Sequence, residues 1–223
     1  MSLSQTEENY LKAIFKISGR EDAIVSTSAI AEEMNTAAAS VTDMLKRLTE
    51  KKYVLYVKYK GARLSTQGKA VAIDLLRKHR LWETFMVEKL NFSWDEVHEV
   101  AEQLEHIQST KLIEQLERFL GYPKVDPHGD PIPDRHGNFE HRSPTSLAHL
   151  KKGQSATIVA VQEDSSAFLR YLEQCELILG AHIEILDIYD YDQSRQIRIN
   201  GQKVHTITQI VAQNLYIKAS EVL

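Results

Sequence analysis

Six side chains between positions 79 and 106 have the types and the spacing of a metal site. All six are imidazoles or carboxylates: His79, Glu83, His98, Glu102, Glu105 and His106. Together these groups suit a first-row divalent metal ion. At about 100° per residue, the last four share an arc of about 100° on a single helix. The pattern therefore predicts a divalent metal site built on two neighbouring helices.

The same six residues also fit arrangements that need no metal ion. An isolated His–Glu pair four residues apart is common on a solvated helix, and the whole set is also compatible with a buried His–Glu hydrogen-bond network. The neighbouring positions are apolar, so the glutamates lie on a partly buried stripe and need partners, which a metal provides. A carboxylate-bridged di-metal hydrolase or oxidase is the alternative from another functional class, since such enzymes also use His/Glu helical pairs.

The elements that must position these residues are long helices. We expect one helix over 66–90 and a second over 94–107, which opens at the capping box formed by Ser93 and Glu96. A third helix begins at Ser109 and ends near Phe119, before Gly121. All five prolines fall between 123 and 144, and this stretch is expected to be a loop and linker.

The first 65 residues predict a winged helix-turn-helix. One helix begins at a capping box of Ser4 and Glu7. A second helix is expected near 28–34 and a third over 38–51, where apolar residues recur with helical spacing. A β-hairpin over 53–65 follows, and this order of elements is that of a DNA-binding winged helix.

Charge supports a nucleic-acid surface in this region. Residues 1–70 carry 11 Lys and Arg against 8 Asp and Glu (11 − 8 = +3), although the whole chain has a net charge of −4. A local basic surface on an acidic protein suggests a polyanion partner; a solvated helix face, or a helix-turn-helix used for protein packing, is the alternative. The candidate DNA-contacting residues are Thr36, Ala39, Ser40, Thr42, Asp43, Lys46, Arg47, Lys60 and Arg63.

Composition excludes several classes of protein. No run of about 18 apolar residues is present, so we expect no membrane span, and the polar N-terminus is not that of a signal peptide. Cys175 is the single cysteine, which excludes an intrachain disulfide and a zinc ribbon and favours a reducing cytoplasm. After the linker, short strands over 156–161, 182–189, 196–199 and 203–205, with a helix over 166–174, predict a small β-barrel.

The chain resembles a known family of regulators. The run RKHRLWETFMVEKLNFSWDEVHEVAEQLEH, followed by DPHGDPIP, is similar to the DtxR/MntR family of iron- and manganese-dependent repressors. The preceding winged-helix segment resembles that of the same family, and the tail resembles the SH3-like third domain of its longer members. The resemblance implies a mainly helical protein with small β elements, a homodimeric repressor in which metal fixes the DNA-binding domains for operator recognition.

The resemblance also implies how the ligands divide. One metal site would use His79, Glu83 and His98, and the other would use Glu102, Glu105 and His106 with a first-helix residue, Asn9 here. Iron-sensing members have Met at the Asn9 position and Cys at the Glu102 position. Typical manganese sensors have Asp at the Asn9 position and Glu where this chain has Lys12. The third-domain carboxylate ligand of iron-type members maps to Asp164 or Glu163.

These observations together predict three domains and one function. The domains are a winged helix over 1–65, a helical metal-binding and dimerisation domain with its linker over 66–145, and an SH3-like (FeoA-like) domain over 146–223. We expect a cytoplasmic Mn(II)-activated repressor, not an enzyme, that binds double-stranded operator DNA and controls metal-uptake genes. Fe(II) is the alternative ion; Mn(II) is favoured because Glu102 and Asn9 replace the sulfur ligands of iron sensors and harden the second site.

Overall fold

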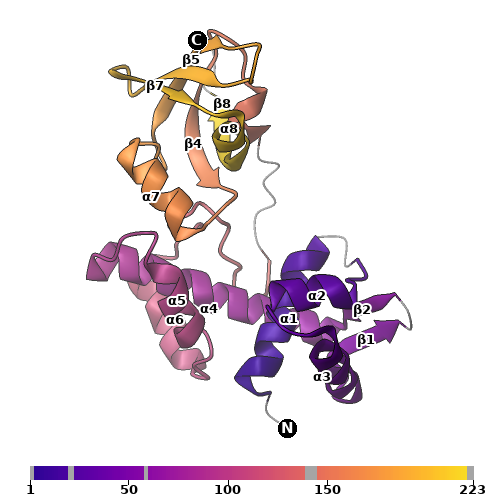
Figure 1. Ribbon diagram of the computed structural model, residues 1–223. Helices are drawn as coiled ribbons and strands as arrows, with labels where there is room; N and C mark the ends of the chain where they lie inside the picture. The colour runs from indigo at the N-terminus through magenta and orange to yellow at the C-terminus, as the bar shows by residue number, and fades with distance from the viewer. Residues whose placement is uncertain (1–2, 20–22, 58–59, 139–144, 220–223) are drawn as a thin grey trace. The chain divides into compact units, whose positions relative to one another are not determined.

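The computed structural model describes residues 3–19, 23–57, 60–138 and 145–219 (Figure 1). The predicted hairpin and the proline-rich linker each extend into residues outside these ranges. The chain divides into two compact units, one formed by 1–82, 101–115 and 133–139 and the other by 83–100, 116–132 and 140–223. Each unit is described here by itself. Among the described residues, no helix combines the length and the apolarity that crossing a membrane requires.

The first unit contains the predicted winged helix. Its elements are α1 (Gln5–Ser18), α2 (Thr27–Glu33), α3 (Ala38–Glu50), β1 (Val54–Val57) and β2 (Gly61–Leu64). The capping box at the start of α1 is confirmed, because the Ser4 hydroxyl accepts from the Glu7 N–H while the Glu7 carboxylate accepts from the Ser4 N–H. Strands β1 and β2 pair in antiparallel register and form the wing.

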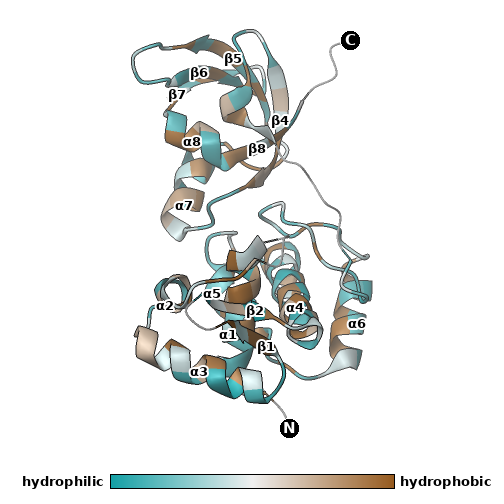
Figure 2. Ribbon diagram, turned by 90° about the vertical axis from the view of Figure 1, so that its right-hand side faces the viewer, coloured by the Kyte–Doolittle hydropathy of each residue, from teal (hydrophilic) through white to brown (hydrophobic). Residues whose placement is uncertain are grey.

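Packing of α3 determines which of its faces is free. Val41, Leu45 and Leu48 are fully buried at helical spacing, so the polar side of the helix faces outward. Figure 2 shows α3 carrying both apolar and polar residues. The turn end of the wing needs glycine: Gly61 has a φ of +124°, and a Cβ there would lie 1.9 Å from the Val25 carbonyl oxygen. This close approach lets the wing pair with Val25 and lie beside the helices.

Three helices follow the wing: α4 (Thr66–Leu90), α5 (Val97–Leu104) and α6 (Thr110–Phe119). The bounds of α4 agree with the prediction, and α4 runs through both units. The helix predicted over 94–107 is shorter than expected. Residues 94–96 form a turn in which the Glu96 carboxylate accepts from the Ser93 N–H, and Glu105 and His106 lie in the turn that follows α5. The Ile107 N–H donates to Leu104 three residues back, which ends the helical ladder early.

The second unit contains an antiparallel six-stranded sheet. Its strands are β3 (Thr145–Ser146), β4 (Ser155–Val161), β5 (His182–Ile188), β6 (Arg195–Ile199), β7 (Lys203–Ile207) and β8 (Leu215–Ala219), in the order β3-β8-β4-β5-β6-β7. A short 3-10 helix η2 (Leu147–His149) and helices α7 (Ser166–Gln174) and α8 (Gln209–Asn214) complete it. The sequence patterns missed β3, α8 and β8. Period-2 burial along β4 and β6 closes these strands over a core of Ile and Leu side chains.

Within this unit, the barrel packs on the segment before α5 and on the DPHG loop. The Ser166 hydroxyl donates to the Asp95 carbonyl at 2.9 Å, and Arg170 pairs with the Asp95 carboxylate at 3.5 Å. The loop comes so close to β4 that a Cβ on Gly129, whose φ is +88°, would lie 2.2 Å from the Val159 carbonyl oxygen. The barrel therefore supports the loop that follows the helical region.

Candidate metal centre and DNA-binding surface

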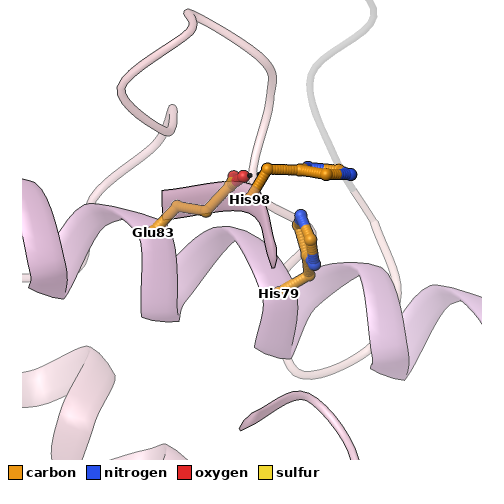
Figure 3. A group of neighbouring side chains, drawn as sticks. All are labelled: His79, Glu83 and His98. Carbon is orange, nitrogen blue, oxygen red and sulfur yellow. Dashed lines mark ion pairs between the residues drawn. The ribbon is translucent and has the colours of Figure 1, made fainter. Parts of the chain in front are cut away.

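Three of the predicted ligands converge in the structure. His79 and Glu83 lie one turn apart on α4, and His98 lies in the first turn of α5 (Figure 3). One ligand atom from each of the three lies within 4.8 Å of the others. The Glu83 side chain is 3% exposed, whereas the His98 side chain is 44% exposed and lies with Nδ1 3.5 Å from the Glu83 carboxylate. This group has two buried members and one member open to solvent, which gives an ion a path of entry.

The orientation of His79 is set by a carboxylate behind it. Its Nδ1 lies 2.6 Å from Oε2 of Glu105. An ionised carboxylate only accepts hydrogen bonds, so Nδ1 carries the hydrogen and the neutral ring keeps its lone pair on Nε2. A metal-ligating histidine characteristically donates its other N–H to such a carboxylate, which fixes the tautomer. Glu105 therefore prepares His79 to bind a metal through Nε2.

A second group of potential ligands shares Glu83. Glu83, Asp126 and His128 also bring one ligand atom each within 4.8 Å, and all three are buried. The His128 Nε2 lies 2.8 Å from the Trp94 carbonyl oxygen, which can only accept, so the lone pair is on Nδ1, 3.9 Å from Glu83. The ring also stacks on Trp94. Asp126 organises the loop by accepting from the N–H groups of His128 and Asp130.

The sequence patterns missed these two loop residues. We expect from sequence that His128 only stabilises its turn, and Asp126 gives no signal beyond its place in the DPHG motif. In the structure Asp126 holds the turn, while His128 turns its acceptor nitrogen toward Glu83. The sequence feature that could have indicated a role for His128 is its place between a proline and a glycine in a loop. The donors around Glu83 are carboxylates and imidazoles, and hydrogen bonds fix the tautomers of His79 and His128. Such a donor set fits a divalent metal ion.

The remaining predicted ligands have a different arrangement. The ammonium of Lys12 lies 2.7 and 2.8 Å from the two carboxylate oxygens of Glu105 and 3.6 Å from Glu102. Glu105 is fully buried, and the Glu102 side chain is 51% exposed. Burial alone would raise the pKa of Glu105, but the hydrogen bond from His79 and the charge of Lys12 lower it below its ordinary value. Lys12 thus supplies a cation where the sequence predicts a metal ion.

The hydrogen-bond partner of His106 lies on α1 and not in this carboxylate pair. The His106 Nδ1 donates to Oε2 of Glu8 at 2.6 Å, and Gln108 donates to the other Glu8 oxygen at 2.9 Å. The His106 Nε2 lies 3.9 Å from Oε1 of Glu105. The Asn9 carboxamide oxygen is buried without a hydrogen-bond partner. A first-helix residue does reach His106, but it is Glu8.

The third-domain candidates stay apart from these groups. Glu163 and Asp164 are exposed in the segment before α7, and the Glu163 carboxylate accepts from the Ser165 hydroxyl. Among the described residues, neither belongs to a group of potential ligands. Cys175 lies at the end of α7 against the barrel core, so no thiol approaches Glu83.

The predicted DNA-contacting residues all lie in the first unit, and all but one of them are exposed. Thr42 is half-buried and donates to the Ala38 carbonyl, whereas the others are exposed on α3, the turn before it, or the wing: Thr36, Ala39, Ser40, Asp43, Lys46, Arg47, Lys60 and Arg63. Lys46 pairs with Asp43 at 3.1 Å with both side chains largely exposed. Such a surface pair contributes little to folding, which leaves its charges available to a polyanion.

Comparison with known families agrees with this architecture. Residues 2–62 match the iron dependent repressor N-terminal DNA binding domain, and residues 65–134 match the iron dependent repressor metal binding and dimerisation domain. Residues 145–219 match the FeoA domain. These three matches cover, in order, the winged helix, the ligand-bearing helices and the barrel.

Comparison with individual proteins points to the same group. The iron-dependent repressor IdeR of Mycobacterium leprae is 32% identical over 132 residues, which are 59% of this chain and 56% of that protein. The chain thus matches little more than half the length of this relative. A manganese-dependent transcriptional repressor in complex with manganese is 28% identical, with a TM-score of 0.82 over 96% of this chain and 100% of that one.

The structure of the manganese regulator SloR is also similar to this chain, at a higher sequence identity. It is 35% identical over 99% of this chain and 100% of that chain, with a TM-score of 0.73. The similarity to a metal-responsive regulator thus extends over nearly the whole chain. The family consists of DNA-binding regulators and not of enzymes. This chain belongs to the DtxR/MntR family of metal-dependent transcriptional repressors.

Proposed function

We propose that this protein is a Mn(II)-activated repressor that binds operator DNA and controls metal-uptake genes. The observation that carries the choice of ion is the donor set around Glu83, which among the described residues consists of carboxylates and imidazoles without a cysteine thiolate. Carboxylate oxygens suit Mn(II), whereas thiolate and thioether ligands select softer ions. The full-length similarity to manganese regulators supports the same ion.

The residues that would hold the ion lie on three segments. His79 and Glu83 come from α4 and His98 from α5, and the loop adds Asp126 and His128. The ion would supply positive charge that draws the carboxylates and imidazoles of these segments together. The hydrogen bonds behind the ligands, from His79 to Glu105 and from His128 to Trp94, hold both rings in the binding tautomer.

DNA would be bound by the outward face of α3 and by the wing. The small residues at the start of α3 let its backbone approach the major groove, and Lys46 and Arg47 lie about two turns further on. Lys60 and Arg63 on the wing are placed for phosphates and would supply affinity rather than sequence discrimination. The protein acts in the cytoplasm, where the operator is located.

Two such modules are needed for tight operator binding. A homodimer reads two half-sites about one helical turn apart. Leu112 and Phe119 on α6 are 41% and 64% exposed and lie seven residues apart, hence on one side of that helix. We place the subunit contact there. The division of labour follows the domains expected from sequence, with DNA binding in 1–65, metal binding and dimerisation in 66–145, and the barrel over 146–223.

The test is fluorescence anisotropy with a labelled DNA fragment from the promoter of a metal-transporter gene. Mn(II) should tighten binding roughly 5–150-fold over the same protein with chelator, which is the usual size of such couplings. A scrambled fragment of equal length should show only weak, salt-sensitive binding that Mn(II) leaves unchanged. Equal operator binding with Mn(II) and with chelator would refute metal activation.

Fe(II) is the second candidate ion. The observation that favours it is the number of imidazoles around Glu83, since two histidines and one carboxylate also suit Fe(II). Anaerobic titration with Fe(II) in the same anisotropy assay separates the two. Operator binding that reaches its full extent with Fe(II) but only part of that extent with saturating Mn(II) would assign the protein to iron, because affinity alone favours Fe(II) at any site of this kind.

A further inference from the structure

Lys12 has the position of a bound cation. Its ammonium contacts both oxygens of Glu105 and lies 3.6 Å from Glu102. It therefore lies between two carboxylates that are three residues apart in the chain. The Lys12 side chain is only 20% exposed, and Glu105 is fully buried. A divalent ion bound to both carboxylates would have to displace this ammonium or lie beside it, and two cations at such a distance repel.

The match between α1 and the end of α5 involves a second pair. Glu8 and Lys12 are four residues apart and share one face of α1. These two residues contact two adjacent residues after α5. Glu8 accepts a hydrogen bond from His106, and Lys12 donates to Glu105. The carboxylate of α1 meets a donor and the ammonium meets an acceptor, so both contacts are satisfied by the chain alone.

We propose that the Lys12 ammonium takes the place of a second metal ion on Glu102 and Glu105, so that α1 is joined to the ligand-bearing helices without metal there. The repressor then responds to an ion at the Glu83 group alone. This inference rests on the proposed function for the role of that remaining site. The side chain of Asn9 is neutral, so this first-helix position adds no negative charge to attract an ion.

The same lysine connects α1 to the metal site that remains. Glu105 accepts from Lys12 with both oxygens and from His79 with Oε2, while His79 offers Nε2 to an ion beside Glu83. A continuous path therefore runs from α1 through Lys12, Glu105 and His79 to the Glu83 group. An ion bound to His79 would polarise the ring and strengthen the hydrogen bond from its Nδ1 to Glu105, and α1 belongs to the DNA-binding unit. Lys12 and Glu105 are positioning residues for this response.

The test counts bound Mn(II) per chain by equilibrium dialysis and elemental analysis. Lys12→Glu removes the ammonium and adds a carboxylate beside Glu102 and Glu105, so it should bind one more ion than the wild-type chain, whatever the wild-type count. The matched control is Lys16→Glu, the same charge change one turn along α1 at an exposed pair with Glu33. It should leave the count at the wild-type value. No gain in folded Lys12→Glu would overturn the proposal.

A second variant keeps the test decisive if Lys12→Glu does not fold. Glu102→Gln changes a half-exposed side chain and should leave the Mn(II) count unchanged, because Glu102 faces the ammonium and no ion. The loss of one ion per chain in this variant would overturn the proposal. Glu83→Gln measures the proposed function separately: an unchanged count there refutes the Glu83 site and leaves the result for Lys12 standing.

Discussion

Glu83 and Glu105 are both buried carboxylates of the ligand-bearing helices, yet their surroundings differ in kind. Glu83 lies beside two imidazoles, with His98 Nδ1 at 3.5 Å and His128 Nδ1 at 3.9 Å. Glu105 lies against the ammonium of Lys12 at 2.7 Å and the Nδ1 of His79 at 2.6 Å. Imidazoles offer lone pairs to an ion, whereas an ammonium is a cation with no lone pair to offer.

This difference teaches that ligand-type residues do not by themselves make a metal site. A buried carboxylate needs a positive or hydrogen-bonding partner, and either an ion or a side chain of the same chain can provide it. At Glu105 the chain provides Lys12, and beside Glu83 it provides imidazoles, which are themselves metal ligands. The predictions that follow test this contrast.

Glu83→Gln should have the largest effect. It removes the carboxylate shared by both groups of potential ligands, so the whole Mn(II)-dependent gain in operator affinity, roughly 5–150-fold, should vanish. Operator anisotropy with Mn(II) and with chelator measures this gain. Glu88→Gln, on the exposed side of the same helix, is the control and should behave as wild type. A retained Mn(II) response in Glu83→Gln would remove this region from the metal site.

Lys12→Met should lower the stability of the metal-free protein. The change leaves the buried Glu105 carboxylate without its ammonium, and breaking a buried ion pair costs about 3 kcal/mol. Urea unfolding with chelator present measures the free energy of unfolding. Lys16→Met breaks an exposed pair with Glu33 and should cost less than about 1 kcal/mol. Equal costs for the two variants would show that Lys12 is an ordinary surface lysine.

Glu105→Gln should weaken metal binding without removing a ligand. It takes away the charge that orients and polarises His79, and loss of such an outer partner lowers metal affinity roughly 10–100-fold. Isothermal titration calorimetry with Mn(II) measures the affinity and the stoichiometry together. The affinity should fall while the stoichiometry stays at the wild-type value. Glu114→Gln on the exposed face of α6 is the control; a drop in stoichiometry instead would make Glu105 a direct ligand.

Lys60→Ala should have the smallest effect and should touch neither region. The exposed wing lysine is placed for a phosphate, so its loss should reduce the slope of log affinity against log salt by about one. Mn(II) affinity and the free energy of unfolding should stay at wild-type values. Lys152→Ala, which breaks an exposed pair in the barrel, should leave the slope as it is. An unaltered slope in Lys60→Ala would exclude it from the DNA surface.

Much of the fold could be predicted from local patterns. The α1 capping box, the apolar spacing of α3 and the bounds of α4 are confirmed, because caps and helical periodicity are determined by residues within a few positions of one another. The end of α5 could not be predicted in this way. Its ladder stops at Leu104 although the ligand spacing continues to His106.

Strands β3 and β8 were missed for a related reason. Both pair with partners far away in the chain, β3 with β8 and β8 with β4, so their stability comes from sheet contacts that short windows of sequence do not contain. The same holds for His128, whose acceptor nitrogen faces Glu83 because Trp94 fixes the ring. Loop residues take their roles from what packs against them.

The sequence by itself determined the types of ligand, the helices that carry them, the basic winged helix and the family. Only the tertiary structure decided which potential ligands gather around Glu83 and which are paired with other side chains. Lys12 is 93 positions from Glu105, and no periodicity relates them. Their contact arises because α1 packs beside the turn after α5, where a buried carboxylate must find a cation. That long-range requirement of charge distinguishes Glu105, which has an ammonium at 2.7 Å, from Glu83, which has the imidazoles of His98 and His128 beside it.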